Sequence, residues 1–515
     1  MPEIVLATLN AKFLHAAFGL RYLLANLGAL QPRAALAEFD LHQRPLDIAE
    51  ALLAREPRII GLGVYIWNVA PTTELVAILK RLRPDVRIIL GGPEVSYETE
   101  SQPVVQLADH VITGEADLEF ARVCQALLEN PGAPLPKIIP APLPDFARLR
   151  LPYEFYTDAD LAHRVTYVEA SRGCPFSCEF CLSSLDIPVR AAPLPELLAA
   201  LDRLLERGAT QLKFVDRTFN LNVATSRAIL EFCLARWRPG RFFHFELVPD
   251  RLPEALREVI ARFPPGALQF EVGVQTFDAP TAARISRRQD YARLEENFRW
   301  LRAYTGVHLH ADLIAGLPGE TLEQFAAGFD RLVTLGPQEI QVGILKRLRG
   351  TPIVRHDAEW GMVYNPHPPY EILRNRHLDF ATVQRLRRFA RYWDLVGNSG
   401  NFLETTTLLW RDPRTGEVGS PFAAFWRWSD WLFQQIGRTD SIALPRLAEL
   451  LFQYLTVERG RDPRRTAETL WRDWQRGGRT DPPEFLRPQL AHLPVAERAP
   501  RRRTGLPKRQ ARHWG

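Results

Sequence analysis

The sequence predicts an α/β protein built from two successive series of strands and helices and a mostly helical C-terminal region. Three observations support this fold class. Short apolar runs alternate with helical patterns through residues 1–130 and again through residues 165–350, and a proline-rich stretch separates the two series. Beyond residue 351, apolar residues recur at helical spacing. The 515 residues provide enough chain for roughly two to four domains.

The first series contains five expected strands that alternate with helices. They cover residues 2–9, 34–39, 58–65, 86–90 and 110–113. This alternation is typical of a parallel, doubly wound sheet, whose ligands bind at the carboxyl ends of the strands. No G-x-G-x-x-G fingerprint is present, so the sequence does not support a nicotinamide cofactor.

Residues 131–164 contain seven prolines and are expected to form an extended linker between the two series. Asp158 and Asp160 are expected to be turn residues within it.

The second series contains six expected strands with helices between them. They cover residues 165–170, 211–216, 242–247, 267–274, 307–314 and 339–345. Six strands in this order predict an open partial (β/α)6 barrel over residues 165–350, again with its site at the carboxyl ends of the strands. His308 and His310 fall on one face of the fifth strand, where polar barrel lining is favoured over a metal pair.

Three of the five cysteines in the chain, Cys174, Cys178 and Cys181, follow the first strand of this barrel in C-x₃-C-x₂-C spacing. Soft thiolates select iron–sulfur clusters, zinc or copper(I). Structural zinc normally takes four ligands, as does a cubane cluster. Three thiolates on a cubane leave one iron open for a small molecule. Zinc and three free cysteines remain alternatives, whereas a disulfide framework is implausible in a long, cysteine-poor chain.

This loop resembles the cluster-binding loop of the radical S-adenosylmethionine (SAM) enzymes, whose pattern is C-x₃-C-x-aromatic-C. Phe180 supplies the aromatic residue. The resemblance implies a [4Fe-4S] cluster on the three cysteines, with SAM chelating the fourth iron. One electron, from a partner such as flavodoxin or ferredoxin, would then cleave SAM to a 5′-deoxyadenosyl radical. No catalytic protein side chain is assigned.

Polar residues at the ends of the later strands resemble SAM-binding positions of the same family. Gln275, Arg287 and Asp312 match the coproporphyrinogen-dehydrogenase-like branch, in which such residues contact SAM. Asp216 stands where Gly-Gly-Glu is usual, and Glu246 is assigned to SAM or to substrate. A strand-end cap or a salt bridge is the alternative role for these side chains.

Three motifs in the first series resemble the cobalamin (B12)-binding domain that precedes many radical SAM enzymes. They are Gly-Leu-Gly-Val-Tyr, Ile-Leu-Gly-Gly-Pro-Glu and Val-Ile-Thr-Gly-Glu-Ala-Asp, in this order. The resemblance implies a Rossmann-like cobalamin domain over residues 1–130. Its expected cobalamin contacts are Tyr65, Trp67, Asn68, Gly91, Gly92, Pro93, Glu94, Gly114 and Glu115.

The histidine motif of cobalamin mutases is not matched. Asp40-Leu41-His42 is followed by Pro45 where that motif has glycine, so we expect His42 to be a surface residue. Cobalamin would then bind without a histidine ligand from the protein. Trp67 is expected near the lower face of the corrin, with packing in an interdomain core as the alternative.

Residues 351–495 are expected to form a helical substrate or accessory domain, and residues 496–515 a basic, disordered tail. The many tryptophans are assigned to core packing rather than to stacking on nucleic acid bases. No signal peptide pattern and no apolar run of about 20 residues is present, which predicts a soluble, cytoplasmic protein without a membrane span.

Together these features favour a cobalamin-dependent radical SAM enzyme that methylates an unactivated carbon through a 5′-deoxyadenosyl radical and methylcobalamin. The substrate is an unidentified small molecule or peptide. Cyclisation or rearrangement is the alternative reaction, and a cofactor-sensing protein that binds nucleic acid is the non-enzymatic one. A methylthiotransferase would need a second cluster, yet only Cys124 lies in the N-terminal region.

Overall fold

The computed structural model describes residues 1–185, 188–412, 415–492 and 508–513. The chain divides into two compact units. The N-terminal unit comprises Met1–Phe219, Lys346–Arg355 and Tyr364–Glu371. The C-terminal unit comprises Asn220–Leu345, His356–Val363 and Ile372–Gly515.

The N-terminal unit contains a parallel six-stranded sheet in the order β2-β1-β3-β4-β5-β6. Its strands are β1 Ile4–Asn10, β2 Ala34–Asp40, β3 Ile59–Gly63, β4 Arg87–Gly91, β5 His110–Thr113 and β6 Ile138–Pro140. The five expected strands are confirmed. The edge strand β6 comes from the expected linker, because Ile138 and Ile139 pair with β5 and Pro140 needs no partner at an edge.

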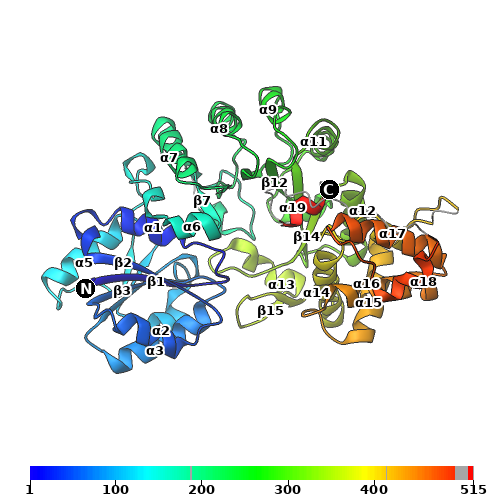
Figure 1. Ribbon diagram of the computed structural model, residues 1–515. Helices are drawn as coiled ribbons and strands as arrows, with labels where there is room; N and C mark the ends of the chain where they lie inside the picture. Colours follow the sequence, from blue (N-terminus) through cyan, green and yellow to red (C-terminus); the bar gives the residue numbers. More distant parts are fainter. Residues whose placement is uncertain (186–187, 413–414, 493–507, 514–515) are drawn as a thin grey trace. The chain divides into compact units, whose positions relative to one another are not determined.

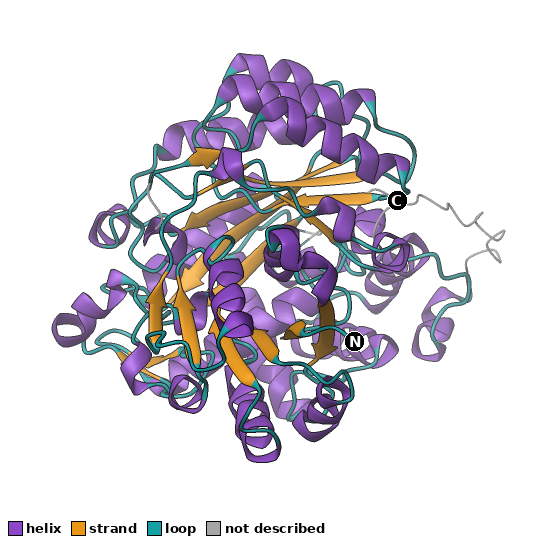
Figure 2. Cartoon of the chain, turned by 90° about the vertical axis from the view of Figure 1, so that its left-hand side faces the viewer, coloured by secondary structure: helices purple, strands orange, loops and turns teal. Residues whose placement is uncertain are grey.

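Helices cover both faces of this sheet, which confirms the doubly wound fold (Figures 1 and 2). Figure 1 shows α1 on one side of the sheet and α2 and α3 on the other. The helices are α1 Phe18–Ala25, α2 Pro45–Leu53, α3 Val69–Leu82, α4 Pro103–Leu107 and α5 Glu119–Glu129. One apolar core joins α2 and α3 to the sheet, and a second joins α1 and α5 to it. His42 is exposed after β2, as expected.

The segment expected to be an extended linker is partly folded. Helix α6 covers Asp158–His163, so the assignment of Asp158 and Asp160 to turns was wrong. Thr157 caps this helix through a reciprocal bond with Asp160, a capping box that the sequence reading overlooked. Asp160 also pairs with the buried Arg21 of α1 at 2.8 Å, which fixes α6 to the first domain.

The six expected strands of the second series are present: β7 and β10 pair in parallel within the N-terminal unit, and β11, β12, β13 and β14 form parallel pairs in this order within the C-terminal unit. These strands are β7 Thr166–Val168, β10 Gln211–Phe214, β11 Phe242–Leu247, β12 Leu268–Gln275, β13 His308–Ala315 and β14 Glu339–Ile344. The helices of the series are α7 Leu194–Glu206, α8 Val223–Ala235, α9 Glu254–Ile260, α10 Ala279–Arg284, α11 Tyr291–Tyr304 and α12 Leu322–Leu335. The alternation of strand and helix is that of an open βα series.

The remainder of the C-terminal unit is mostly helical, as expected. Its main helices are α14 Phe380–Leu395, α15 Pro421–Ile436, α16 Leu444–Gln453 and α17 Pro463–Arg476, with the shorter α13 Asp357–Trp360, α18 Arg487–Leu490 and a strand pair β15 Val363–Tyr364 and β16 Ile372–Arg374. Trp393, Trp410, Trp426 and Trp428 are buried, so their expected role in core packing is confirmed. No helix in the described ranges is long and apolar enough to cross a membrane.

Part of the expected basic tail is folded. Lys508–His513 form the helix α19, whereas residues 496–507 and 514–515 of the expected tail lie outside the described residues. Arg509 pairs with Asp394 at 2.6 Å and with Glu339 at 3.1 Å. Two carboxylates of the C-terminal unit thus hold a segment that composition alone assigns to solvent.

Candidate active site

The three clustered cysteines lie on one loop that is closed at its base. Strand β8 (Ser171–Arg172) pairs antiparallel with β9 (Arg190–Ala191), and the cysteine loop is the chain between them. Gly173 has a φ of +90°, a conformation that glycine adopts without strain, so the chain turns directly into Cys174. The short ribbon therefore sets where the loop begins and ends.

The chemistry of the loop fits an iron–sulfur cluster. Cys174 and Cys178 are buried and Cys181 is partly exposed. Burial, together with the neighbouring Cys181 and Cys178, raises the pKa of the Cys174 thiol, so the thiols lie close enough to affect one another. No three potential ligands among the described residues converge on one metal ion. A cubane does not require such convergence, because each cysteine binds a different iron.

Asp216, which was expected to bind SAM, instead holds the start of this loop. Its carboxylate accepts hydrogen bonds from the backbone N–H of Ala170 at 2.9 Å and from the Ser171 hydroxyl at 2.6 Å. It is 2% exposed, and burial raises its pKa to about 6. These partners lie next to β8, so the structure gives Asp216 a positioning role.

The middle of the loop, beside Cys178, is held by a segment distant in sequence. The carbonyl of Glu179 accepts a hydrogen bond from the Ile353 N–H at 3.0 Å, and the Glu179 carboxylate pairs with Arg355. Phe180, the aromatic residue of the motif, follows directly and is partly exposed.

Three expected SAM residues gather at the carboxyl ends of β12 and β13 in the C-terminal unit. Gln275 ends β12 with a φ of +70°, a conformation that costs energy in any residue except glycine and is often kept at functional sites. Arg287 donates a hydrogen bond to the carbonyl of Gly273. Gly273 lies opposite Asp312 in the β12–β13 register, so the three polar side chains belong to one strand-end region.

Glu246 lies one residue before the end of β11 and is partly exposed. It is in register with Glu271 of β12, whose carboxylate contacts His244 at 2.9 Å. A position inside the strand, among other polar side chains, suits contact with a ligand inside the barrel.

The two histidines of β13 are paired with carboxylates. His308 is buried and its Nε2 lies 2.8 Å from Glu339, while the Nε2 of His310 lies 3.3 Å from Asp312. These pairs agree with polar barrel lining, the role favoured from the sequence.

Glu320, in the turn after β13, gives a testable pH dependence. It is 2% exposed, and burial raises its pKa to about 8, while it accepts a hydrogen bond from the Thr276 hydroxyl. Between pH 4.5 and about 8, Glu320 therefore keeps its proton in the folded protein, whereas the unfolded chain has already released it. The contribution of this group to stability is present below pH 4.5 and is lost by pH 8 to 9.

We expect Glu320→Gln to remove this pH dependence, because the neutral amide keeps the partner Thr276. The variant should gain stability relative to the parent as the pH rises from 5 to 9, by up to roughly 4 kcal/mol. Thermal unfolding across this range measures the difference. A parent and variant with parallel pH profiles would contradict the assignment.

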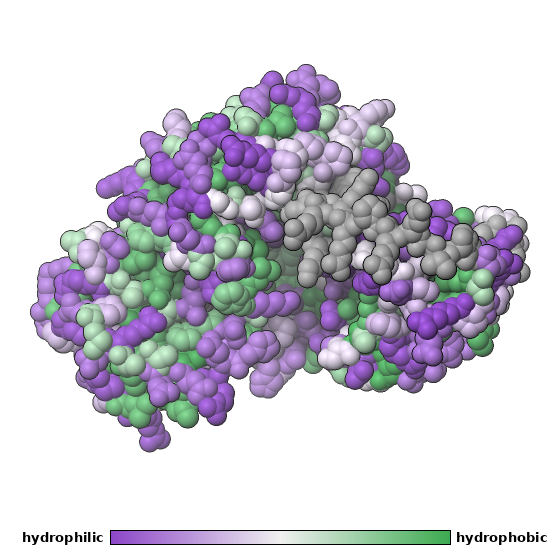
Figure 3. All heavy atoms as spheres, viewed as in Figure 1, coloured by the Kyte–Doolittle hydropathy of each residue, from purple (hydrophilic) through white to green (hydrophobic). Residues whose placement is uncertain are grey.

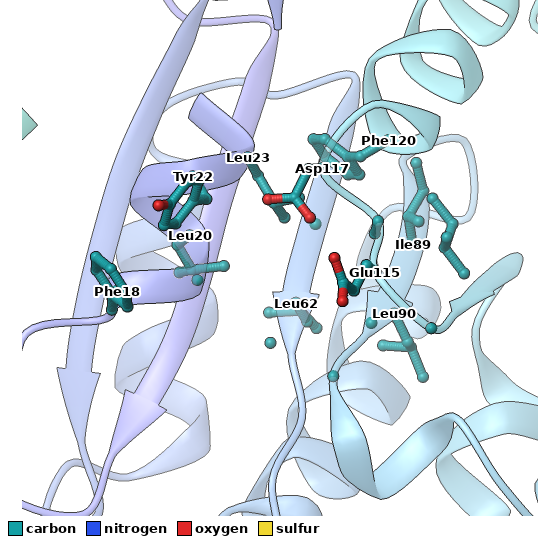
Figure 4. Close-up of a pocket in the computed structure, with 18 of the residues that line it drawn as sticks. Phe18, Leu20, Tyr22, Leu23, Leu62, Ile89, Leu90, Glu115, Asp117 and Phe120 are labelled. Atoms are coloured by element: carbon teal, nitrogen blue, oxygen red, sulfur yellow. The ribbon is translucent and has the colours of Figure 1, made fainter. Parts of the chain in front are cut away.

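A cavity of about 260 Å³ lies at the carboxyl ends of β3, β4 and β5, beside α1 (Figure 4). Its walls are largely apolar, and Glu115 and Asp117 provide carboxylates along one side of it (Figure 4). The apolar lining includes Phe18, Leu20, Leu23, Leu62, Ile89, Ile112 and Phe120, and glycine occupies positions 61, 63, 91, 92 and 114. An apolar cavity at the carboxyl ends of parallel strands is a candidate ligand site by its location and chemistry.

Five of the nine expected cobalamin residues line this cavity. They are Tyr65, Gly91, Gly92, Gly114 and Glu115. Gly92 is required by the fold itself, because a Cβ there would lie 2.5 Å from the Val64 carbonyl oxygen. Pro93 is exposed and begins a short 3₁₀ turn.

Asn68 and Glu94 were expected to contact cobalamin but are structural. Asn68 is 0% exposed, and its amide bonds the Tyr65 N–H and the carbonyls of Leu9 and Gly63. It therefore shapes the turn into α3.

Glu94 is 4% exposed and pairs with Arg349 at 2.9 Å and with the Tyr370 hydroxyl at 2.6 Å. Its carboxylate is thus used to hold the 346–371 segment within the N-terminal unit.

Trp67 is exposed at the surface of the N-terminal unit. It is 45% exposed and stacks on Tyr65 with ring centroids 4.5 Å apart and planes 4° from parallel. Its indole N–H donates to the Leu9 carbonyl at 3.3 Å. Hydrophobic residues, green in Figure 3, reach the surface of the N-terminal unit at several places.

Sequence reasoning missed Arg172 and the contribution of α1 to the cavity. Arg172 precedes Gly173-Cys174 directly, and this proximity to the motif was an available signal. No sequence signal marked Phe18 and Leu20 as cavity residues, because apolar residues of an amphipathic helix normally pack in the core.

Three family models match successive parts of the chain. The B12 binding domain matches residues 4–123, the radical SAM superfamily matches residues 168–332, and a family of unknown function, DUF4080, matches residues 358–493. The matched ranges follow the order in which the two sheets and the helical region occur.

Two curated relatives each match about half of the chain. The chain is 28% identical over 270 residues to the ribosomal protein uS12 methylthiotransferase RimO of Anaeromyxobacter sp. (50% of this chain, 54% of that protein). It is 23% identical over 334 residues to the cobalamin-dependent radical SAM methyltransferase TokK of Streptomyces tokunonensis (56% and 47%). The chain thus spans about half the length of these curated relatives.

A solved structure shares the fold over most of both chains. The radical SAM methyltransferase TsrM from Kitasatospora setae, solved with cobalamin and a [4Fe-4S] cluster, superposes with a TM-score of 0.57 at 18% identity, covering 72% of this chain and 82% of that one. Residues 168–332 of the present chain are therefore assigned to a radical SAM domain. Residues 4–123 are assigned to a B12-binding domain, and the cofactors that go with these two domains are a [4Fe-4S] cluster, SAM and cobalamin.

Proposed function

We propose that this protein is a cobalamin-dependent methyltransferase that methylates an unactivated carbon of a small molecule or peptide. The observation that carries the proposal is that the cysteine loop and the glycine-lined cavity belong to the same compact unit. The methyltransferases TokK and TsrM, which share this domain combination or fold, support it.

Cys174, Cys178 and Cys181 are assigned to the cluster, and Phe180 to the SAM side of the loop. Gln275, Arg287 and Asp312 are assigned to SAM, since a guanidinium suits its carboxylate and a carboxylate accepts from ribose hydroxyls. Glu246 is assigned to SAM or substrate. When bound, the cluster and SAM supply a radical that removes hydrogen, and cobalamin supplies the methyl group.

The cavity is assigned to the nucleotide tail of cobalamin, whose flat aromatic base suits a narrow slot bordered by glycines. Gly61, Gly63 and Gly91 carry no side chain into this space. The stacked pair of the partly buried Tyr65 and the exposed Trp67 is assigned to the lower face of the corrin, where an indole would exclude water from cobalt. Chemically, these residues bind and shield the cofactor rather than ligate it.

Trp67→Ala is expected to weaken hydroxocobalamin binding about tenfold, or ~1.4 kcal/mol, because it removes an exposed aromatic face. Its effect on thermal unfolding should be small, since the side chain is 45% exposed. Absorbance titration with hydroxocobalamin measures the affinity. Tyr304→Ala, which removes a 70% exposed aromatic ring from α11, is the matched control and should leave the affinity unchanged. Equal affinities for all three proteins would contradict the assignment of Trp67.

Methyl transfer is tested with SAM that carries a labelled methyl group. Anaerobic, cluster-reconstituted protein, hydroxocobalamin and a one-electron reductant should form both 5′-deoxyadenosine and S-adenosylhomocysteine, and the latter should require hydroxocobalamin. Formation of 5′-deoxyadenosine without S-adenosylhomocysteine would favour cyclisation or rearrangement.

The match to a methylthiotransferase is not taken as evidence for the same reaction. A methylthiotransferase needs cysteines for a second cluster. The two further cysteines of this sequence, Cys124 and Cys233, are both 0% exposed and lie on the separate helices α5 and α8. The flavodoxin- or ferredoxin-like reductant and the cytoplasmic location remain part of the proposal, because the cluster requires electrons and a reducing compartment.

A further inference from the structure

The base of the cysteine loop is clamped by a single carboxylate. Arg172 and Arg190 face each other across the β8–β9 ribbon, in direct register. Both guanidiniums bind Glu115: the Nη1 of Arg172 lies 2.9 Å and the Nη1 of Arg190 lies 3.1 Å from its Oε2. The second amino group of Arg190 bonds the other oxygen of Glu115. One side chain therefore joins the two ends of the loop.

Glu115 also belongs to the wall of the cavity. It lies in the turn between β5 and α5, and Gly114, Glu115, Ala116 and Asp117 all line that space. Figure 4 shows the carboxylates of Glu115 and Asp117 beside the cavity. Asp117 binds Arg172 as well, at 2.8 and 3.2 Å. A single turn of the first domain thus borders the cavity on one side and holds the loop ribbon on the other.

The clamp is largely shielded from water and makes several further contacts. The side chains of Arg172 and Arg190 are each 13% exposed and that of Glu115 is 19% exposed. The Arg172 guanidinium also lies over the rings of Tyr22 and Phe146, at 4.4 and 4.9 Å from their centroids. The Arg172 guanidinium also pairs with Glu169, three residues earlier in the chain, at 2.9 Å. Planar, multiply bonded guanidiniums of this kind fix geometry more tightly than a point charge would.

We propose that Glu115 is a positioning residue that couples the cavity to the cysteine loop, so that the cavity ligand and the cluster favour each other's binding. A ligand that orders the β5–α5 turn orders Glu115, and through its two arginines both ends of the loop. By reciprocity, a loop held by its cluster orders the cavity wall. This inference rests on the proposed function, because it takes cobalamin as the ligand of the cavity.

The test measures hydroxocobalamin affinity in cluster-loaded protein and in a cluster-free form in which Cys174, Cys178 and Cys181 are replaced by alanine. In the parent, loading the cluster should tighten hydroxocobalamin binding at least about fivefold, the lower range of such couplings. In Glu115→Gln, which cannot pair with two guanidiniums, the ratio should fall to about one. Electron paramagnetic resonance of the reduced cluster gives a second readout, since hydroxocobalamin should shift the signal of the parent and leave that of Glu115→Gln unchanged.

Glu3→Gln is a matched control. Glu3 also pairs with two arginines, Arg33 and Arg58, in the same domain. Glu3 directly precedes β1 and so lies at the amino ends of the strands, whereas the cavity lies at their carboxyl ends. The control should keep the full coupling ratio. Arg190→Lys keeps the charge but loses the paired geometry, so it tests the clamp if Glu115→Gln proves unstable, and its ratio should also fall.

The outcomes separate the two proposals. A coupling ratio in Glu115→Gln or Arg190→Lys equal to that of the parent overturns the role of Glu115. A parent that binds both cofactors with a ratio of one overturns it too and leaves the proposed function standing. A parent that binds no hydroxocobalamin in either form overturns the proposed function itself.

Discussion

Cys178→Ala is expected to abolish SAM cleavage, lowering the rate of 5′-deoxyadenosine formation at least about 1,000-fold. The loop offers three cysteines to a cluster, and the site depends on all of them, because the fourth iron is left for SAM. With two thiolates the cubane loses a second protein ligand and is not retained. Iron content measures the loss of iron, and the visible absorbance of the reconstituted protein measures the loss of the cluster. Mass spectrometry of 5′-deoxyadenosine measures the loss of SAM cleavage.

Cys233→Ala is the matched control for this substitution. Cys233 is buried on α8, and burial raises the pKa of its thiol, so it is a core residue rather than a ligand. The control should keep its cluster and cleave SAM, with a loss of stability of about 1 kcal/mol for the missing sulfur. Wild-type iron content in Cys178→Ala, or loss of iron in Cys233→Ala, would contradict the assignment of the cluster to this loop.

Ala116→Trp is expected to abolish corrinoid retention, weakening hydroxocobalamin binding at least about 100-fold. Ala116 lines the cavity, next to the Glu115 that clamps the loop. An indole on this residue would occupy much of the 260 Å³ available, so the cofactor tail would have no place to enter. Gel filtration after incubation with hydroxocobalamin, followed by absorbance, measures retention.

Two further substitutions separate blockage from damage to the fold. Ala116→Val should weaken binding less than Ala116→Trp does, since the loss should follow side-chain volume. Ala51→Trp places the same indole on an exposed position of α2 and should bind as the parent does. Full corrinoid retention by a folded Ala116→Trp variant would show that the tail binds elsewhere.

The fold was largely predictable because strands and helices leave periodic patterns. The seven residues of β1 are all buried, and such short apolar runs mark the buried strands of a parallel sheet. The edge strand β6 was missed because two paired isoleucines within a proline-rich stretch give no such pattern. Helix α19 was missed because its order comes from Asp394 and Glu339, which lie far away in the sequence.

The candidate site was less predictable, because a residue's partners decide whether it meets a ligand. Asn68 lies three residues after the first cobalamin-domain motif and Glu94 ends the second, yet their polar groups are used within the fold. Glu94 pairs with Arg349 and Tyr370, more than 250 residues later, and no local pattern shows such a pair. The cysteine loop was recognisable because its three ligands are close in sequence and their spacing carries the chemistry.

The central claim is that one chain holds both an iron–sulfur cluster and cobalamin. The most direct measurement is the amount of iron, sulfide and corrinoid per chain after anaerobic reconstitution, incubation with hydroxocobalamin and removal of unbound material. The account predicts about four irons, four sulfides and one corrinoid per chain. Iron and sulfide in that amount without bound corrinoid would contradict it, and so would corrinoid bound to a protein that retains no cluster.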